Sequence, residues 1–244
     1  MYHFFAEHEN IFDDYIDIRG GDVNHIKNVI RLKPGDEVLI SSGDNYDYHC
    51  VIDTIGDVVR SRITEVNEKG NELPVKVYLF QGLPKSDKME LIIQKMVELG
   101  VYEIVPVAMK RSVVKLDDKK AKTKIARWNS ISESAAKQSK RSIIPEVSDV
   151  LTFRQALEKA KELDMLLLPY ECAEGMEYTR KVVSGISNGS SVGIFIGPEG
   201  GFDGDELELA KEAGCSIITL GKRILRTETA GMMLMSVIMY NMEE

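Results

Sequence analysis

Two short segments in the second half of the chain combine glycines with charged side chains in a pattern that could hold a ligand. The first is GPEGGF, residues 197–202, whose glycines let the backbone approach a ligand closely or adopt positive φ, while its proline fixes the turn. The second is LGKRILRTETA, residues 220–230, a polar turn that leads directly into an apolar run. A binding loop packed on its own supporting helix would have this pattern. A tight turn with no ligand explains the glycines of the first segment equally well.

The residues that are missing narrow the chemistry. No Gly-Lys-Ser or Gly-Lys-Thr follows GPEGGF, and it lacks the Gly-x-Gly-x-x-Gly of a dinucleotide site, so neither common phosphate loop is supported. All four histidines, at positions 3, 8, 25 and 49, precede the second half, which therefore has no histidine triad, two-histidine zinc motif or imidazole base. Such a domain is more plausible as a catalyst if a cofactor supplies the reactive bond and the protein supplies positioning.

The elements that must position these segments alternate between strands and helices. After residue 74, apolar strands at VKVYLFQ, EIVPVA, MLLLP, SVGIFI and SIITL are separated by amphipathic helical patterns. This alternation predicts an α/β fold with a parallel sheet covered on both faces. Ligands of such sheets bind beyond the carboxyl ends of the strands. Three segments follow predicted strands and are expected to meet there: residues 166–171, 195–202 and 220–230.

Several helix ends can be predicted from the sequence. We expect a helix over residues 86–100, capped by Ser86 and ended by Gly100, and a last helix over residues 229–242. Two further helices begin with capping boxes, which pair Thr152 with Gln155 and Asp203 with Glu206.

The first ~70 residues have a different rhythm, with short strands broken by turns. Apolar residues alternate on both sides of SGDN, which indicates a hairpin, and NEKGNELP, residues 67–74, is a plausible linker. The sequence therefore predicts a small β-barrel at residues 1–70 and an α/β domain at residues 74–244.

Composition sets the broad class. The chain has 244 residues, of which 43% are hydrophobic and 29% charged, as expected of a soluble globular protein. It has no apolar stretch near the ~18 residues that span a bilayer, and its acidic start does not resemble a signal peptide, so we expect a cytoplasmic protein with no membrane contact. Cys50, Cys172 and Cys215 form no Cys-x-x-Cys pair and are expected to be reduced core residues; no metal site is expected.

The charge is unevenly distributed. The whole chain carries −8, yet residues 110–141 hold eleven Lys or Arg against three acidic residues, a local charge of +8. A basic block in an acidic protein is typical of contact with a phosphate backbone. A solvated helix face followed by a lysine-rich loop would explain the block equally well.

Together with QGLPKSDKMELIIQKMVELGV (residues 81–101) and SESAAKQSKR (132–141), the two loop segments resemble the ribosomal RNA small subunit methyltransferase E (RsmE) family of the SPOUT superfamily. The likeness covers nearly the whole chain, because HIKNVIRLKPGDEV, residues 25–38, resembles part of the family's PUA-like barrel. It implies a SPOUT methyltransferase domain with a parallel sheet and a C-terminal deep trefoil knot, preceded by an N-terminal PUA-like β-barrel that binds RNA. The knot rests on the resemblance alone, since knots are almost absent from ordinary folds.

The resemblance also implies a reaction. S-adenosyl-L-methionine would be the methyl donor, S-adenosylhomocysteine the product, and N3 of a uridine in 16S ribosomal RNA of the small ribosomal subunit the acceptor. A homodimer is implied as well. The residues expected to bind the cofactor are Leu168, Pro169, Ile196, Gly197, Glu199, Gly200, Gly201, Leu220, Gly221, Ile224, Leu225, Arg226, Thr229 and Ala230.

Three residues are candidates for catalysis. Loss of the N3 proton leaves negative charge on O2 and O4 of uridine, which Arg226 could stabilise; a salt bridge to Glu228 or Glu199 is the alternative use of this arginine. Glu199 could accept the proton, but we favour a role in bracing its turn, with water as another candidate base. Gln138 is expected at the rim that faces the RNA or near the target base.

RNA contacts are expected along the basic block and in the first half. The candidate residues are His25, Arg31, Arg111, Lys119, Lys120, Lys122, Lys124, Arg127 and Arg141. This sequence departs from the family pattern at Lys137 and Lys140, where the family has Glu and Gly.

Three other functions remain open. A SPOUT enzyme could methylate a ribose 2′-oxygen, although the PUA-like half and LRTETA argue against it. A non-enzymatic RNA-binding or assembly factor could keep the fold without the cofactor. A nicotinamide-dependent oxidoreductase is the weakest alternative, because its glycine motif is missing.

Overall fold

The computed structural model describes residues 1–171 and 175–243, which divide into two compact units. The first unit is Met1–Glu72 with Ala136–Ile144, and the second is Leu73–Ala135 with Pro145–Glu244. The expected domains differ from these units in one main respect, because residues 136–144 belong to the first unit. A domain boundary predicted from the pattern of strands and helices divides the chain at one point. It cannot detect a later segment that packs back on the first unit.

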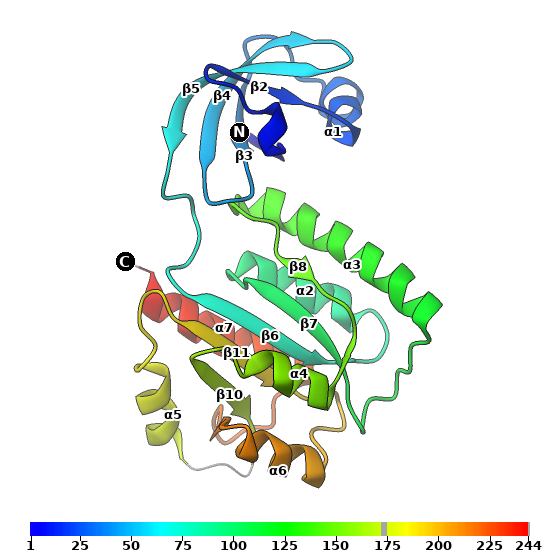
Figure 1. Ribbon diagram of the computed structural model, residues 1–244, viewed down its shortest axis with the longest axis vertical. Coiled ribbons are helices and arrows are strands. Elements are labelled where there is room, and N and C mark those ends of the chain that lie inside the picture. The colour runs from blue at the N-terminus through cyan, green and yellow to red at the C-terminus, as the bar shows by residue number, and fades with distance from the viewer. Residues whose placement is uncertain (172–174, 244) are drawn as a thin grey trace. The chain divides into compact units, whose positions relative to one another are not determined.

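The first unit is built on short strands (Figure 1). Its elements in chain order are β1 (Tyr2–Phe5), η1 (His8–Asn10), β2 (Tyr15–Ile18), α1 (Gly21–Asn24), η2 (His25–Ile30), β3 (Glu37–Ser41), β4 (Asp47–Ile55) and β5 (Val59–Asn67). The strands form a curled five-stranded sheet in the order β1-β3-β4-β5-β2, with β1 parallel to β3 and the other neighbours antiparallel. The small β fold expected for this half is confirmed.

The predicted hairpin is formed by β3 and β4. The apolar residues that alternate on either side of SGDN are cross-strand partners, since Val38 pairs with Cys50 and Ile40 with Tyr48. Val38, Ile40 and Cys50 are at most 2% exposed and belong to the core of the unit. The alternation in the sequence therefore records which face of the sheet is buried.

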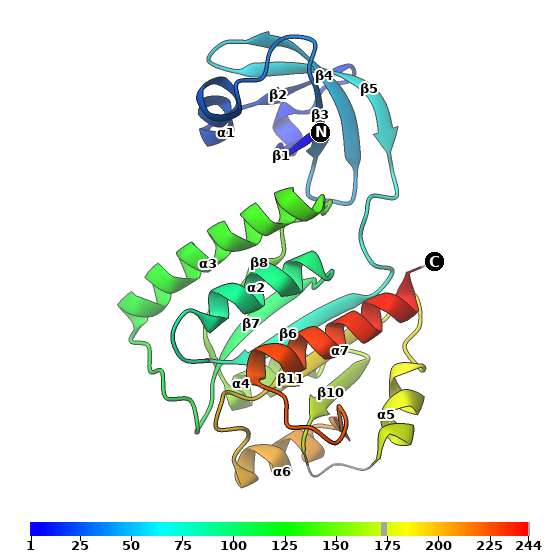
Figure 2. The same ribbon diagram turned by 180° about the vertical axis from the view of Figure 1, so that it is seen from behind.

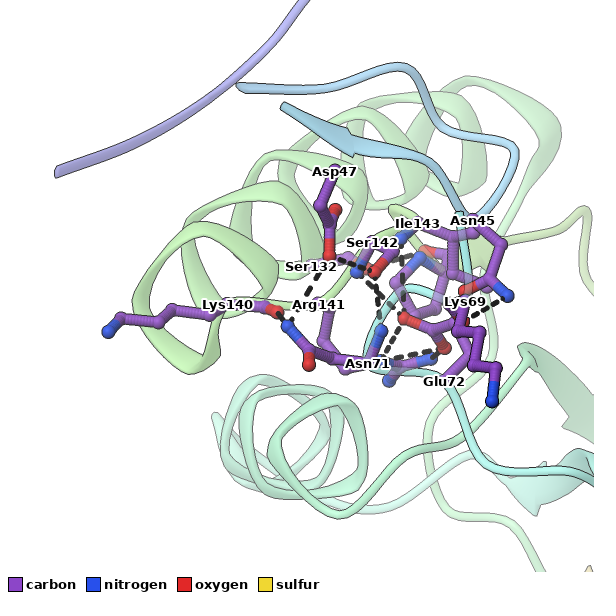
Figure 3. Close-up of polar contacts among 11 residues, drawn as sticks. Asn45, Asp47, Lys69, Asn71, Glu72, Ser132, Lys140, Arg141, Ser142 and Ile143 are labelled. Atoms are coloured by element: carbon purple, nitrogen blue, oxygen red, sulfur yellow. Dashed lines mark hydrogen bonds and ion pairs between the residues drawn. The ribbon is translucent and has the colours of Figure 1, made fainter. Parts of the chain in front are cut away.

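A buried polar network attaches residues 140–143 to the strands of the first unit (Figure 3). The Ser142 hydroxyl donates to Asp47 Oδ2 at 2.8 Å and accepts from the Asn71 backbone N–H at 2.8 Å. Glu72 accepts from Arg141 Nε at 2.9 Å and from the Ser142 N–H at 2.8 Å. Because buried polar groups are costly to leave without partners, these bonds fix the returning segment in place.

The network continues to the N-terminus through Ser41. Its hydroxyl donates to Asp47 Oδ1 and lies 2.7 Å from Nε2 of His3, whose residue is only 6% exposed. Burial disfavours the imidazolium and lowers the pKa of His3 below 6.5, although the charge of Asp47 opposes the shift. His3 is therefore neutral in the folded protein near pH 7.

The second unit contains the α/β elements. They are β6 (Lys76–Gly82), α2 (Lys88–Glu98), β7 (Glu103–Ala108), α3 (Asp118–Ser139), β8 (Glu146–Val147), β9 (Leu151–Thr152), α4 (Phe153–Ala160), β10 (Met165–Pro169), α5 (Met176–Val183), β11 (Ser191–Ile196), α6 (Gly204–Glu212), β12 (Ser216–Ile218) and α7 (Thr227–Met242). The last residues of α3, from Ala136, belong to the first unit.

The sheet of the second unit has seven strands in the order β12-β10-β11-β6-β7-β8, with β9 also paired to β7, and every ladder is parallel. Helices α4 and α6 cover one face (Figure 1) and α2 and α7 the other (Figure 2). A stacked ring pair, Phe80 and Phe195, lies in the core beneath α4 and α6. The predicted parallel sheet with two covered faces is confirmed, whereas the trefoil knot stays a prediction.

Most predicted helix ends are confirmed, although the last helix begins at Thr227 and not at residue 229 as expected. Both capping boxes are present, and Gly100 follows α2 with φ +99°. The prediction for Ser86 was wrong: α2 begins at Lys88 with Asp87 at its N-cap, and Ser86 has φ +54°. A residue in the left-handed region cannot occupy the extended conformation that a capping side chain needs.

The expectation that the cysteines are buried and reduced is confirmed for two of them. Cys50 and Cys215 are free and buried in the cores of the first and second unit, and burial raises the pKa of each thiol to about 12. Cys172 lies outside the described residues.

The backbone at Lys140, where the family has Gly, has a φ of +58°. This angle explains why glycine suits the position. A β-carbon is strained in this region and glycine is not. We expect Lys140→Gly to raise the free energy of unfolding by about 0.5–1 kcal/mol, measured by urea titration. Lys140→Ala is the control that keeps the β-carbon and should give no gain; equal gains in both variants would contradict this explanation.

His3 predicts a pH dependence of stability. Because its pKa is lower in the folded than in the unfolded chain, the unfolded state binds more protons, and stability falls as the pH drops below about 6.5. His3→Gln should reduce the change in the free energy of unfolding between pH 7 and pH 5. An unchanged slope in this variant would show that His3 is not the group responsible.

Candidate functional site

Three loops meet at one edge of the second unit's sheet. Strands β12, β10 and β11 are neighbours and parallel, so the chain leaves all three at the same edge. The segments that follow them, together with the start of α7, line a cavity of about 600 Å³. This is the place that the sequence predicted, and it is where sheets of this kind bind ligands.

The backbone shapes much of the cavity wall. Gly201 and Gly221, in two different loops, have φ values of +67° and +112°, which side chains other than glycine adopt only under strain. A β-carbon at Gly200 would lie 3.0 Å from Cβ of Arg111, and Arg111 Nη1 donates to the Gly200 carbonyl at 3.2 Å. Arg111, expected to contact RNA, thus packs on the glycine turn and lines the cavity.

A buried hydrogen-bond chain joins the cavity walls. Gln81, at the end of β6, donates through Nε2 to the Thr227 hydroxyl at 2.9 Å, and this hydroxyl donates to the Gly197 carbonyl at 2.7 Å. Gln81 is fully buried and Thr227 is 6% exposed. The first residue of α7 is therefore fixed to the central strands and to the turn after β11.

An ion-pair cluster joins the same walls nearer the surface. Lys88 Nζ lies 3.2 Å from Glu199 Oε1 and 3.2 Å from Glu228 Oε2, and the side chains of these three residues are between 17% and 27% exposed. The Lys85 backbone N–H donates to Glu199 at 3.1 Å. Residues from the start of α2, the glycine turn and the first turn of α7 therefore share one cluster.

Glu199 is held in its charged form. Burial opposes ionisation, but backbone N–H groups, including that of Lys85, and the Lys88 ammonium together lower the pKa of Glu199. A carboxylate with a lowered pKa and engaged oxygens is a poor proton acceptor. The contacts of Glu199 match the bracing role better than that of a base.

Arg226 lies at the N-cap position of α7 and lines the cavity, and its residue is exposed. Within residues 1–171 and 175–243, its guanidinium forms no hydrogen bond or ion pair with another residue. Arg226 forms no salt bridge to Glu228 or Glu199 among the described residues, and both carboxylates pair with Lys88 instead. The guanidinium is thus available to an anionic group in the cavity.

Two of the expected cofactor-binding residues do not line the cavity. Leu168 is buried in the core under α4 and α6, and Thr229 is exposed on α7. All the others do line it. Sequence reasoning missed several lining residues, among them Lys88, Tyr170, Phe202, Thr219, Arg223 and Thr227. Thr219 directly precedes the predicted loop of residues 220–230 and Thr227 lies within it, whereas nothing near Lys88 in the sequence indicates a cavity.

The expected RNA-binding lysines lie on the first turns of α3. Lys119, Lys120 and Lys122 are exposed and Lys124 is half-buried. Arg127, also expected to contact RNA, donates to both carboxylate oxygens of Glu90 at 2.6 and 2.7 Å. Its charge is therefore partly neutralised within the second unit.

The remaining predicted residues belong to the first unit. His25 and Arg31 are exposed in and after η2, and Gln138 is exposed in the last turn of α3, so none of them lines the cavity. The structure does not bring Arg141 to the surface as expected of an RNA contact. It is 4% exposed and paired with Glu72, because its guanidinium completes the buried network.

Neither a metal-binding cluster nor a membrane-spanning helix is present among the described residues. No group of three or more His, Cys, Asp and Glu side chains there is arranged to hold a metal ion. No helix in residues 1–171 and 175–243 is long and apolar enough to cross a membrane.

Comparison with known families matches both parts of the chain. The sequence model described as RNA methyltransferase domain matches residues 71–239, and that described as RNA methyltransferase PUA domain matches residues 18–69. The first match alone covers more than half of the chain.

Individual proteins are similar over nearly the full length. The protein named ribosomal RNA small subunit methyltransferase E in Bacillus subtilis (strain 168) is 42% identical, with 93% of this chain and 90% of that protein covered. Its namesake in Mesomycoplasma hyopneumoniae (strain 232) is 33% identical, with 97% and 98% covered. A crystal structure of the Neisseria gonorrhoeae protein of this name, bound to S-adenosyl methionine, is 31% identical with a TM-score of 0.83, covering 97% of this chain and 95% of that one.

Thr227 allows a test of the buried hydrogen-bond chain. Thr227→Val keeps the shape but leaves Gln81 and the Gly197 carbonyl without this partner, so we expect the free energy of unfolding to fall by about 1–3 kcal/mol. Trp128 is the single tryptophan and lies in the second unit. Its fluorescence in a urea titration of the whole protein measures the unfolding of that unit. Thr229→Val, an exposed change on the same helix, is the matched control and should alter stability by less than about 0.5 kcal/mol. Equal losses in both variants would contradict the prediction.

Proposed function

Because the chain belongs to the ribosomal RNA small subunit methyltransferase E family, we propose that it transfers a methyl group from S-adenosyl-L-methionine to N3 of a uridine in 16S ribosomal RNA. The observation that carries the proposal is the cavity at the edge of the parallel sheet, with the available guanidinium of Arg226 in its lining. The acceptor atom goes beyond the family name and is part of the proposal.

The cavity suits the proposed cofactor. Its volume of about 600 Å³ lies within the ~300–1,000 Å³ of typical small-molecule sites. Apolar side chains of Ile196, Leu220 and Leu225 offer contacts to a flat aromatic base, and the backbone of the glycine turn can hydrogen-bond polar groups. S-adenosylmethionine, when bound, supplies an activated methyl group.

Arg226 is the proposed catalytic cation. Uridine N3 must lose its proton, and the charge that remains is shared by O2 and O4. A fixed guanidinium beside these oxygens would stabilise that charge without having to reorganise. Arg226 immediately precedes the first residue of α7, which is anchored by Gln81, and this supports a fixed position for the backbone of Arg226 in the cavity lining.

Glu199 and Gln138 receive different roles. The bonds from Lys85 and Lys88 to Glu199 support its proposed function as a brace of the turn, with the N3 proton passing to water instead. Gln138 is exposed at the end of α3 and stays a candidate for contact with the target base.

RNA binding is proposed for both units. His25 and Arg31 of the first unit, and Lys119, Lys120 and Lys122 of the second, are exposed and able to meet phosphates. Such contacts make affinity depend on salt and not on base sequence. The proposed partner is the small ribosomal subunit in the cytoplasm, and a homodimer with the C-terminal trefoil knot is proposed on family grounds.

The reaction can be tested with labelled S-adenosylmethionine and small subunits that lack the modification. We expect N3-methyluridine from the wild type. Arg226→Ala should bind the cofactor but transfer the methyl group about 100-fold more slowly or worse, as for the loss of one charge-stabilising group. Arg154→Ala, an exposed arginine on α4 away from the cavity, is the control and should retain full activity.

Other products identify the alternatives. A ribose-methylated product would indicate 2′-oxygen chemistry, and RNA binding without S-adenosylmethionine binding would indicate an assembly factor. Full activity in Arg226→Ala would remove this residue from the mechanism and leave the reaction itself standing.

A further inference from the structure

Lys88 is the first residue of α2, and its ammonium group lines the cavity. It is the only group within 4.0 Å that pairs with both Glu199 and Glu228 among the ion pairs of the described residues. Its interactions with Glu199 first, and then with Glu228, raise the pKa of Lys88, so it stays charged across the physiological range. One cation thus pairs with two carboxylates that come from different segments of the chain.

The two carboxylates come from different walls. Glu199 lies in the glycine turn after β11, and Glu228 lies in the first turn of α7, two residues after Arg226. Both lie 3.2 Å from the same nitrogen, so without the cation two negative charges would face each other across a partly buried space. Like charges at such range repel, and the repulsion would separate the walls.

Other cationic groups line the cavity, but none of them pairs with Glu199 or Glu228 among the described residues. Arg111 is 3.6 Å from Asp203 and donates to the Gly200 carbonyl. Among the described residues, Arg223 and Arg226, which also line the cavity, form no ion pair with either carboxylate. The charge balance between the turn and α7 therefore depends on Lys88.

We propose that Lys88 is a positioning residue, which holds the glycine turn and the start of α7 at the separation that S-adenosylmethionine requires. This rests on the proposed function, because the ligand is the cofactor named there. Lys88 acts through Glu199 and Glu228 and takes no part in methyl transfer.

The proposal predicts a pH signature in Lys88→Met. Without the cation, the pKa of one of the two carboxyl groups rises, since its protonation relieves the repulsion. A group whose pKa is raised on folding destabilises the folded arrangement at high pH, and this loss disappears as the pH falls through the raised value. The loss of affinity for S-adenosylmethionine should therefore be large at pH 8 and small at pH 5.5. Loss of packing alone would not produce this dependence on pH.

The main experiment is calorimetric titration of S-adenosylmethionine into the intact protein at both pH values. We expect Lys88→Met to bind about 10-fold more weakly than the wild type at pH 8 and within about 3-fold of it at pH 5.5. Lys88→Arg, which keeps the charge, should remain within about 3-fold of the wild type throughout. The double variant Lys88→Met with Glu228→Gln, which removes one of the two charges, should recover most of the affinity at pH 8.

A matched control lies on the same helix. Lys95 pairs with Glu98 on α2 and does not line the cavity, so Lys95→Met removes a similar surface pair and should leave the affinity unchanged at both pH values. Wild-type affinity in Lys88→Met, or an equal loss at pH 5.5 and pH 8, would overturn the proposal.

A measurement without ligand separates this proposal from the proposed function. The difference in unfolding temperature between the wild type and Lys88→Met should narrow from pH 8 to pH 5.5. If the wild type does not bind S-adenosylmethionine, the proposed function fails. If the difference in unfolding temperature between the wild type and Lys88→Met is the same at both pH values, the role of Lys88 is rejected as well.

Discussion

The site depends on the hydroxyl group of Thr227, which accepts from Gln81 and donates to the Gly197 carbonyl. This group is buried, so each of its two bonds would be costly to lose and the geometry has little freedom. It fixes the first residue of α7 relative to the two central strands β6 and β11. The backbone of Arg226, the residue before Thr227, takes its position from this point.

Two kinds of interaction share the task of holding the walls. In the interior, neutral hydrogen bonds join β6, the glycine turn and α7, and they do not respond to salt or pH. Nearer the surface, the charged cluster of Lys88, Glu199 and Glu228 joins the turn to α7 and responds to both.

The sequence predicted those features that depend on neighbouring residues. Strand and helix alternation, both capping boxes and the three loops around the cavity have local patterns, and all were found. Gln81 and Lys88 could not be predicted, because their partners lie more than 100 residues away and a lone glutamine or lysine has no distinctive pattern. The prediction for Arg141 was wrong for the same reason. Its charge indicated a surface contact with RNA, whereas its position in the fold depends on Glu72, a residue distant in the sequence.

The two buried thiols give each unit its own reporter. Cys50 lies in the core of the first unit and Cys215 in that of the second, and a thiol with a pKa of about 12 is almost wholly protonated at neutral pH. Alkylating reagents attack the thiolate, so modification must wait until the surrounding core opens. In a chain carrying Cys172→Ser, the two alkylation rates would time the opening of the RNA-binding half and of the catalytic half independently, within one molecule.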